Sequence, residues 1–391
     1  MKTEIVNDRL IIFLEGRIDS GNAPDIEAEI LGALDENKER DLTFDASGLS
    51  YISSAGLRIL MKVKKTVSGD VEITEVGQDI YEIFETTGFT DIFDIKKKIK
   101  TMSVEGCEII GQGAVGDVYR VDADTIVKVY NTPNAVPMIR NEQKMAKAAF
   151  IAGVPTAISY DIVKAGDKYG SVFELLKAKT FNDLIIESPE TAADTVRKYS
   201  DFIKSIHEIE MTPGIAPYSK DVFLGYLDSI GRFIDPEVLP RLRQLISEIP
   251  DEDHFVHGDL QMKNVMLAGD EPMLIDMDTL SLGHRIFDLQ ALFVTYVEFG
   301  EDNPGESMSF KGYSDEMSLF IFDRFMEDYF DTTDRAVLDP ILDKVRILAG
   351  VRFIFILDLL GITGGELGEK RIRHTNEHFR ELLPKVDKLY F

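Results

Sequence analysis

The stretch GQGAVG at residues 111–116 constrains the fold of this chain most strongly, because its glycines are followed by a strand pattern and not by a helix pattern. A dinucleotide-binding fingerprint needs a helix directly after the glycines, and a Walker A loop ends in GK[ST], which is missing here. Residues 117–121 continue with alternating β-prone residues, which is typical of a strand. We therefore expect Gly111, Gly113 and Gly116 to lie in a β-hairpin, where backbone amides can approach phosphate oxygens without a side chain in the way.

The next strand pattern, TIVKVY at residues 125–130, contains a lysine among β-branched residues. Alternation along a strand places Lys128 on the opposite face from Val127 and Val129. A lysine in such surroundings needs a carboxylate partner, and Glu142 on the helix that follows is the natural candidate. The alternative is a solvent-exposed lysine on an edge strand, which the place of Lys128 in an ordered series of motifs disfavours.

The stretch HGDLQMKN at residues 257–264, followed by the strand-like LIDMD, places charged side chains between apolar segments. Such side chains are either costly parts of a core or parts of a site. Phosphoryl transfer needs a carboxylate that orients or deprotonates the attacking hydroxyl, together with oxygen ligands for Mg²⁺, for which one Asp and one Asn suffice. Asp259, Asn264 and Asp276 provide these groups in this order.

Together with the glycine-rich hairpin and the strand lysine, HGDLQMKN and LIDMD resemble the motifs of the aminoglycoside phosphotransferase and choline kinase superfamily, relatives of the protein kinases. The resemblance covers roughly residues 107–391. It implies ATP and Mg²⁺ as cofactors. It also implies that Asp259 is the catalytic base and that Asn264 and Asp276 are the magnesium ligands.

On the nucleotide side, the resemblance implies that the three glycines and Lys128 contact the phosphates and that Glu142 pairs with Lys128. The segment FELL at residues 173–176 corresponds to the hinge whose backbone reads the edge of the adenine. Glu174 and Leu176 are the expected cofactor-binding positions of this hinge.

The same resemblance suggests roles for three further residues and leaves a fourth without one. Asp278 can assist the metal, Asp288 in RIFDLQAL is expected to fix the catalytic loop, and His207 in SIHEIE is expected to pack and not to react. Gln261 stands where the superfamily commonly has histidine or lysine, and the sequence assigns it no role.

Departures from the protein kinases concern the phosphate acceptor. Gly258 stands where protein kinases have an arginine that anchors a phosphorylated activation loop, only eleven residues separate Asp276 from Asp288, and no APE motif follows. These features favour a small-molecule hydroxyl or amine over a protein substrate. The helices expected from about residue 314 to 391 carry acidic residues, which slightly favours a cationic acceptor.

Residues 1 to about 100 alternate strand and helix patterns, which predicts a small α/β sheet with helices packed against it. The expected strands are LIIFLEG, DLTFDAS and VEITEV, and the expected helices are residues 23–34 and SSAGLRILMKVKKTV. The stretch FDASGLSYISSAGLRIL at residues 44–60 resembles the STAS domain of anti-sigma-factor antagonists. By this resemblance Ser54 is a phosphosite for a partner kinase, and the STAS surface is a candidate site for a protein partner.

Ser54 has two interpretations that do not exclude each other. The N-terminus of a helix accommodates added phosphate charge. A serine at a helix start is also a common N-cap. The aspartate that usually precedes this serine in the family is Ser53 here.

The predicted fold is an α/β STAS-like domain followed by an α+β protein-kinase-like bilobal domain. The STAS-like regulatory domain is expected at residues 1–100 and a basic linker at residues 101–106. A β-rich N-lobe is expected at residues 107–176, and a mainly helical C-lobe with the catalytic loop and the acceptor region at residues 177–391.

The composition argues against several function classes. The formal net charge over 391 residues is −26, which argues against a nucleic-acid partner because nucleic-acid binding requires a basic surface. Cys107 is the only cysteine, so neither an intrachain disulfide nor a cysteine-based zinc cluster is possible. The N-terminus is charged and the apolar stretch FIFILDLLGI is interrupted by Asp358, which predicts a cytoplasmic protein without membrane contact.

The sequence thus predicts ATP- and Mg²⁺-dependent transfer of a γ-phosphoryl group to a hydroxyl of a small-molecule acceptor, regulated through the STAS domain. Two alternatives stay open. One is a nucleotide-sensing pseudokinase that acts through protein binding, as an anti-sigma-factor antagonist does. The other is a kinase that phosphorylates Ser54, in cis or in trans. The intact metal-ligand positions argue against the pseudokinase.

Overall fold

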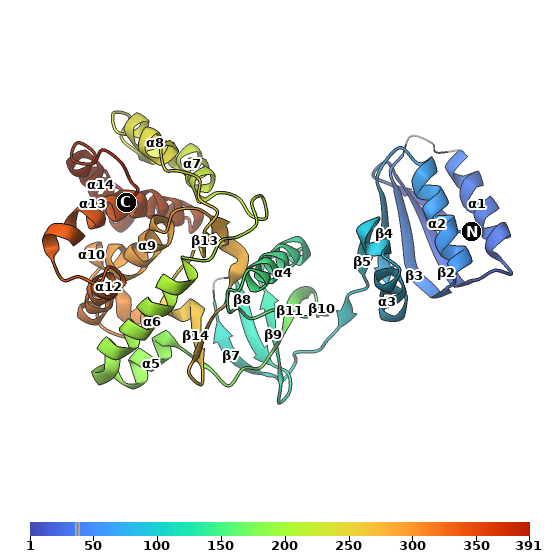
Figure 1. Cartoon of the computed structure of the whole chain (residues 1–391), viewed down its shortest axis with the longest axis horizontal. Coiled ribbons are helices and arrows are strands. Elements are labelled where there is room, and N and C mark those ends of the chain that lie inside the picture. The colour runs from blue at the N-terminus through green and yellow to red at the C-terminus, as the bar shows by residue number, and fades with distance from the viewer. Residues whose placement is uncertain (36, 38–39, 114) are drawn as a thin grey trace. The chain divides into compact units, whose positions relative to one another are not determined.

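The computed structural model describes residues 1–35, 37, 40–113 and 115–391, so Ala114 of the glycine-rich motif lies outside the described residues. The chain forms two compact units. The first contains Met1–Ser103 and Ile162–Asp167, and the second contains Val104–Asp161 and Lys168–Phe391. Figure 1 labels their helices and strands. Each unit has a hydrophobic core of its own.

The first unit is built on a sheet with the strand order β1-β2-β3-β4-β5, in which β1 is antiparallel to β2 and the other neighbours are parallel. Parallel neighbours need crossover connections, which the helices between successive strands provide. The elements are β1 Thr3–Val6, β2 Arg9–Ile18, α1 Ala23–Asp35, β3 Leu42–Ile52, α2 Ser54–Thr66, β4 Val71–Val76, α3 Gln78–Thr86, the 3-10 turn η1 Phe89–Asp91 and β5 Asp94–Lys97.

Alternate residues of β2 are apolar and buried, which explains why helices pack against this sheet. Leu10, Ile12 and Leu14 are buried in the core, which also contains Val63 of α2 and Phe84 of α3. The sequence predicted β2, β3, β4, α1 and α2, and the structure confirms these elements. It adds β1, α3 and β5, and all four residues of β1 are exposed, so no burial pattern marks this strand.

A short parallel pairing joins β6 (Lys100–Thr101) to β10 (Asp161–Ala165), with Val163 opposite Lys100. The amide of Met102 donates a hydrogen bond to the carbonyl oxygen of Lys164 at 2.9 Å. This pairing groups residues 162–167 with the first unit, although the sequence placed them in the kinase-like N-lobe.

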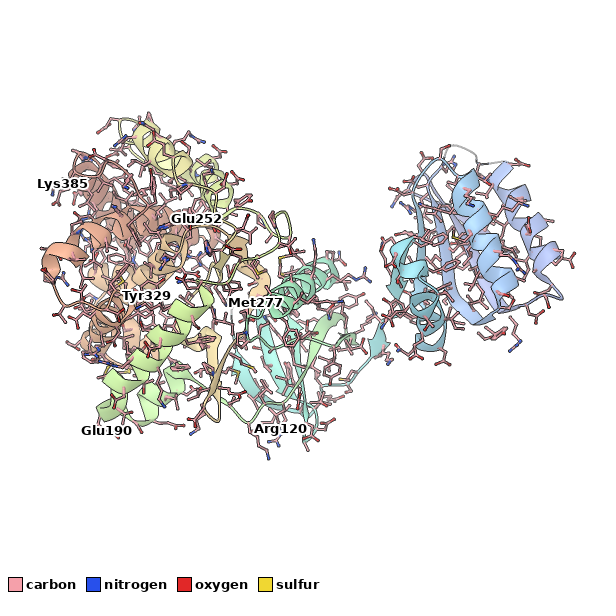
Figure 2. All side chains as sticks on the ribbon, viewed as in Figure 1. Arg120, Glu190, Glu252, Met277, Tyr329 and Lys385 are labelled. Atoms are coloured by element: carbon pink, nitrogen blue, oxygen red, sulfur yellow. The ribbon has the colours of Figure 1, made fainter. Side chains whose placement is uncertain are left out.

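The second unit begins with the antiparallel strands β7 Glu108–Gln112, β8 Gly116–Arg120, β9 Thr125–Tyr130 and β11 Lys168–Glu174. Strand β9 lies between β8 and β11, so Lys128 is not on an edge strand. Val127 and Val129 are buried on the face opposite Lys128, as alternation predicts. The helix α4 follows at Val136–Ile151, and Met277, labelled in Figure 2, is buried in the segment η5 on which α4 packs.

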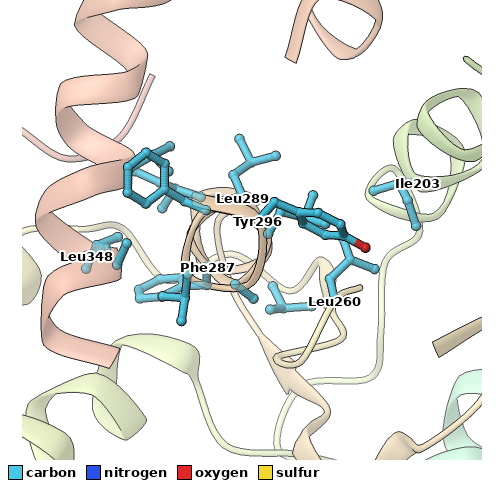
Figure 3. Close-up of a cluster of buried hydrophobic side chains, with 14 of the residues drawn as sticks. Ile203, Leu260, Phe287, Leu289, Tyr296 and Leu348 are labelled. Carbon is cyan, nitrogen blue, oxygen red and sulfur yellow. The ribbon is translucent and has the colours of Figure 1, made fainter. Parts of the chain in front are cut away.

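The rest of the second unit is mainly helical. Helix α9 is buried along its whole length, which places it at the centre of the core. Figure 3 shows Phe287 and Leu289 of this helix near Leu260, Ile203 and Leu348, which come from three other segments. The helices are α5 Phe181–Glu187, α6 Ala192–Ile206, α7 Ser219–Ile230, α8 Leu239–Ser247, α9 Ile286–Phe293, α10 Phe299–Asp302, α11 Glu306–Lys311, α12 Asp315–Tyr329, α13 Arg335–Leu359 and α14 Gly365–Leu382.

Short strands and turns lie between these helices, several of them around the stretch HGDLQMKN. They are β12 Lys179–Thr180, η2 Pro189–Thr191, η3 Gly231–Phe233, β13 Phe255–Val256, η4 Met262–Asn264, β14 Val265–Ala268, β15 Glu271–Leu274, η5 Met277–Thr279, β16 Ser281–Leu282 and the π-helical η6 Val294–Glu298. Throughout the part of the chain that the structure describes, no helix combines the length and apolar character needed to cross a membrane.

Candidate active site

The loop of residues 257–264 runs from β13 into η4 and is held by a buried carboxylate of α9. Asp288 accepts hydrogen bonds from the amide of His257 at 2.9 Å and from the amide of Gly258 at 2.8 Å. Burial alone would raise the pKa of Asp288, but the hydrogen bond with His207 and the backbone donors hold this pKa below its ordinary value. The expectation that Asp288 fixes this loop is therefore confirmed.

His207 supports Asp288 at Oδ2, the same oxygen that accepts from the amide of His257. Its Nε2 lies 3.0 Å from Asp288 Oδ2, and its Nδ1 lies 2.7 Å from the hydroxyl of Tyr329. His207 is 2% exposed, so it is a buried structural residue, as expected.

Gly258 is required at its position for a steric reason. Its φ of 84° lies in the left-handed region, and a Cβ at this residue would lie 2.3 Å from the carbonyl oxygen of Thr279. Thr279 in turn donates a hydrogen bond from its hydroxyl to the carbonyl oxygen of His257 at 2.9 Å. The loop and η5 are thus in direct backbone contact, which only glycine permits.

The carboxylate of Asp259 is held from three directions. Arg352 donates to Oδ1 at 2.7 Å, while Gln261 and Asn264 donate to Oδ2 at 3.1 and 3.2 Å. The Asp259 side chain remains 39% exposed, so one edge of the carboxylate is open to a ligand. Gln261, which received no role from the sequence, positions Asp259.

Arg352 on α13 was not predicted as a site residue. Its guanidinium is 10% exposed and donates to the carbonyl oxygen of Gly258 as well as to Asp259. The sequence separation of 93 residues removes any local motif. One signal was available: Arg352 interrupts the apolar run from Ile347 to Phe355, and a charge in such a run needs a buried partner.

Asn264 and Asp276 are connected through the backbone, because the amide of Ile275, the residue before Asp276, donates to the carbonyl oxygen of Asn264 at 3.0 Å. The Asn264 side-chain nitrogen donates to the carbonyl oxygen of Asp259 at 2.8 Å, which leaves the side-chain oxygen of Asn264 as an acceptor. Asp276 adopts a left-handed backbone with φ of 60°, and its side chain is 41% exposed. Burial, followed by the charges of Glu142 and Asp276, raises the pKa of the nearby Asp278 to about 6.

Lys128 connects the sheet to this loop. Its ammonium group forms ion pairs with Asp276 and with Glu142, the latter at 3.4 Å. Burial alone would lower the pKa of Lys128, but the two carboxylates raise it above its ordinary value. Glu142 is buried and also accepts a hydrogen bond from the hydroxyl of Tyr130, a contact that the sequence did not indicate.

The three glycines lie in the predicted hairpin of β7 and β8. The amide of Gly113 donates to the carbonyl oxygen of Gly116 at 3.0 Å. A Cβ on Gly116 would lie 2.2 Å from the carbonyl oxygen of Val129, so β8 approaches β9 too closely for any side chain there. Gly111 is opposite Val118 in the hairpin register.

The expected hinge follows β11. Glu174 is the last residue of this strand, is exposed and lies opposite Thr125. The amide of Leu175 donates to the carbonyl oxygen of Asp124 at 2.7 Å, and Leu176 is partly buried immediately after it.

Ser54 belongs to the first unit, where it is exposed and is the first residue of α2. The cap of this helix is Ser53, whose hydroxyl oxygen accepts a hydrogen bond from the amide of Ala55 at 3.2 Å. The N-cap interpretation therefore applies to Ser53 and not to Ser54. Asp45 Oδ1 accepts a hydrogen bond from the amide of Ser47 at 2.8 Å within β3.

Comparison with family models divides the chain in the same way. Residues 1–102 match the model of the STAS domain, and residues 106–315 match the model described as the phosphotransferase enzyme family. A curated relative, the putative anti-sigma factor antagonist BtrV of Bordetella bronchiseptica, is 38% identical over 93 residues, which cover 23% of this chain and 79% of BtrV. The fold predicted from the sequence, a STAS-like domain followed by a kinase-like domain, is thereby confirmed.

Solved structures similar to this chain include two proteins of small-molecule kinase families. A thermostable mutant of aminoglycoside phosphotransferase APH(4)-Ia, in complex with ADP and hygromycin B, is 12% identical, with a TM-score of 0.49 over 72% of this chain and 94% of that chain. A choline/ethanolamine kinase family protein from Mesorhizobium loti is 14% identical, with a TM-score of 0.46 over 72% of this chain and 92% of that chain.

Proposed function

Because the chain belongs to the phosphotransferase enzyme family and begins with a STAS domain, we propose that it transfers the γ-phosphoryl group of ATP to a hydroxyl of a small-molecule acceptor in a Mg²⁺-dependent reaction. One observation carries the proposal. Asn264 donates to Asp259 within the loop of residues 257–264, the amide next to Asp276 donates to the backbone of Asn264, and Lys128 on the sheet forms an ion pair with Asp276. This combination of a base candidate, hard oxygen donors and a phosphate-binding cation is what phosphoryl transfer needs.

The donor groups fit magnesium. The nitrogen of the Asn264 side chain is already engaged by Asp259, so the side chain offers its oxygen, and the Asp276 carboxylate is partly exposed. Mg²⁺ prefers such oxygen donors and keeps several waters. Asn264 and Asp276 would hold the ion, with Asp278 as a further carboxyl beside them. When bound, the ion neutralises charge that develops on the phosphate oxygens.

The nucleotide would be held by the sheet side of the site. Phosphate oxygens would replace Asp276 as the partner of Lys128, while Glu142 keeps the ammonium group in place. The hairpin amides would approach the phosphates, because the glycines keep side chains out of this space. The backbone around Glu174 and Leu176 would contact the adenine.

Asp259 would orient the acceptor hydroxyl and accept its proton. Arg352, Gln261 and Asn264 fix the carboxylate, and the exposed edge of Asp259 is free for a donor from the acceptor. Holding the attacking group in line with the phosphorus provides most of the catalysis in such reactions.

The acidic C-terminal helices give little support for a cationic acceptor. Several of their carboxylates are already paired with cations of the protein, namely Asp328 with Arg324, Asp358 with Arg232 and Glu381 with Lys385. The cation next to Asp259 is Arg352, which a polycationic acceptor would approach unfavourably. We therefore propose a small-molecule hydroxyl acceptor without a requirement for positive charge.

The test is ATP turnover across a panel of small-molecule alcohols, amino alcohols and aminoglycosides, with wild type, Asp259→Ala and Asp270→Ala. Asp270 is an exposed aspartate on the turn after β14 and serves as a matched control. We expect acceptor-dependent turnover in wild type and Asp270→Ala and its loss in Asp259→Ala. Equal turnover in all three would refute the role of Asp259, and ATP binding without transfer would identify a pseudokinase.

A second proposal concerns Ser54. Its hydroxyl is exposed and the cap of α2 is provided by Ser53, so Ser54 is available to accept a phosphoryl group. Incubation with MgATP followed by intact mass measurement tests this, with Ser54→Ala, Ser53→Ala and Asp259→Ala as comparisons. One added phosphoryl group in wild type and Ser53→Ala alone would support phosphorylation by the kinase domain and regulation through the STAS domain. An unmodified wild type contradicts it.

A further inference from the structure

Two histidines and a carboxylate lie together in the helical part of the second unit, in residues that the predicted reaction does not use. His374 and His378 are one helical turn apart on α14, so their rings project from the same face. Glu301 comes from α10, which packs against α14. The ligand atoms of these three side chains lie within 4.8 Å of one another.

His374 is already oriented by a second carboxylate. Its Nδ1 lies 3.1 Å from Oδ2 of Asp302, which leaves Nε2 with a lone pair. Asp302 also pairs with Lys370 at 3.2 Å. A carboxylate that holds the far nitrogen of a histidine is the usual outer partner of a metal-bound imidazole.

A cation already lies between the other two side chains. The guanidinium of Arg346 forms an ion pair with Glu301 and donates to Nε2 of His378 at 2.9 Å. Nη1 of Arg346 also lies 3.3 Å from Nδ1 of His378, and in the tautomer with its proton on Nδ1 the lone pair of Nε2 faces the guanidinium. The lone pair and the carboxylate thus converge on a positive charge.

The buried residue Glu298 lies about one helical turn before Glu301. It ends the π-helical segment η6, is 4% exposed, and its Oε2 has no hydrogen-bond partner among the described residues. Its carboxyl lies close enough to Glu301, Asp302 and Arg346 to interact with their charges.

We propose that Glu301, His374 and His378 form a binding site for a divalent transition-metal ion such as Zn²⁺, with Glu298 as an adjacent buried acid. Two imidazoles and a carboxylate suit zinc, cobalt or nickel, whereas Mg²⁺ prefers oxygen donors alone. Ligand bonds of about 2.0–2.2 Å require the ligand atoms to approach more closely than they do now, through small rotations of exposed or partly exposed side chains. The Arg346 side chain, which is 22% exposed, moves to solvent when the ion binds.

The metal would join α10 to α14 beside α13, the helix that carries both Arg346 and the Asp259 partner Arg352. The site shares no residue with the proposed magnesium site. Its binding test therefore does not depend on the proposed phosphotransfer activity.

The test uses Co²⁺ as a spectroscopic probe and Zn²⁺ in calorimetry, on the full chain. We expect visible Co²⁺ absorption of nitrogen and oxygen ligation, and loss of at least about 10-fold in Zn²⁺ affinity in His374→Ala and in His378→Ala. The matched control is His254→Ala, which removes a histidine that also lies near a carboxylate, Glu252, at 3.6 Å. Wild-type affinity in both α14 variants would overturn the proposal.

Two further variants test the role of Arg346 and distinguish this site from the proposed magnesium site. Arg346→Gln removes the competing cation, so its Zn²⁺ affinity should rise, and an unchanged or lower affinity contradicts the role of Arg346. Asp276→Ala removes a proposed magnesium ligand and should retain the Co²⁺ spectrum, whereas loss of the spectrum would assign the ion to the magnesium site. Both histidines are partly exposed, so we expect their variants to fold. Thermal unfolding of each variant without metal checks this.

Discussion

Replacement of Arg352 by methionine removes the guanidinium that positions Asp259 while it keeps most of the buried side-chain volume. Arg352 donates to Asp259 Oδ1 at 2.7 Å and to the carbonyl oxygen of Gly258. We expect turnover to fall by roughly 10- to 100-fold, because an attacking group misplaced by about an ångström costs on the order of 10²-fold. Gln261 and Asn264 still hold Asp259 Oδ2, which limits the displacement.

The same substitution has a smaller effect on the free energy of unfolding. Hydrogen bonds to charged groups contribute about 1.5–3 kcal/mol each. The Asp259 side chain is 39% exposed, so water replaces part of the lost interaction and the low end of this range applies. With the second bond included, and with the buried methionine offsetting part of the loss, we expect a decrease of about 2 kcal/mol.

The assay compares kcat and the KM for ATP in wild type, Arg352→Met, Arg352→Lys and Arg335→Met. Arg335 lies on the same helix in an exposed pair with Asp339, so its variant controls for the lost charge. A positioning role predicts a lower kcat with an unchanged KM for ATP, partial rescue by lysine, and wild-type values in Arg335→Met. It also predicts that Arg352→Met has no further effect on turnover in an Asp259→Asn background.

Wild-type turnover in a folded Arg352→Met would refute the positioning role. An additional loss in the Asp259→Asn background would show that Arg352 acts on another group. Equal losses from methionine and lysine would show that the charge itself contributes nothing.

Three other predictions concern stability and are measured by urea denaturation. Gly258→Ala should lower the free energy of unfolding by more than about 2 kcal/mol, because alanine is strained in the left-handed region and its Cβ would lie 2.3 Å from the carbonyl oxygen of Thr279. Gly269 has a φ of 64° but open space around it, so Gly269→Ala should lower the free energy of unfolding by only about 1–2 kcal/mol. Equal decreases in the two variants contradict the steric argument. Asp288→Ala leaves the buried amides of the loop unpaired and should cost about 3–5 kcal/mol, and a cost below about 1 kcal/mol would show that the loop has other anchors. Burial lowers the pKa of Lys311 from 10.5 to about 8, so between these pH values the unfolded chain binds more protons than the folded chain, and the free energy of unfolding of wild type rises with pH. Lys311→Met should therefore be more stable than wild type at pH 8, and this difference in the free energy of unfolding should shrink by up to about 3 kcal/mol from pH 8 to 10.5. A difference that does not change with pH contradicts the pKa shift.

The sequence predicted elements that local patterns determine. The glycines of the hairpin are needed where β8 approaches Val129, and the alternation of TIVKVY put Lys128 opposite the buried valines. Spacing along a strand or helix fixes such features without knowledge of the tertiary fold. Asp288 was assigned to the loop because a resemblance supplied the contact that spacing alone cannot give.

Contacts between distant segments were not predictable in the same way. Arg352 and Tyr130 act through partners that follow from packing and not from any local pattern. The pairing of β6 with β10 covers only two residues of each strand, which is too short for a periodic pattern in the sequence. Ser53 and Ser54 are both acceptable caps by composition, and only the backbone at the start of α2 decides between them.

The loop of residues 257–264 illustrates why the missing contacts matter for the proposed function. Its own sequence provides the chemical groups, but three separate elements fix their geometry: α9 through Asp288, α13 through Arg352, and η5 through the hydroxyl of Thr279. Phosphoryl transfer depends on positioning and on charge more than on covalent chemistry. Residues without any motif can therefore influence the rate as strongly as motif residues, and a variant of α13 is a sharper test of this site than another substitution within HGDLQMKN.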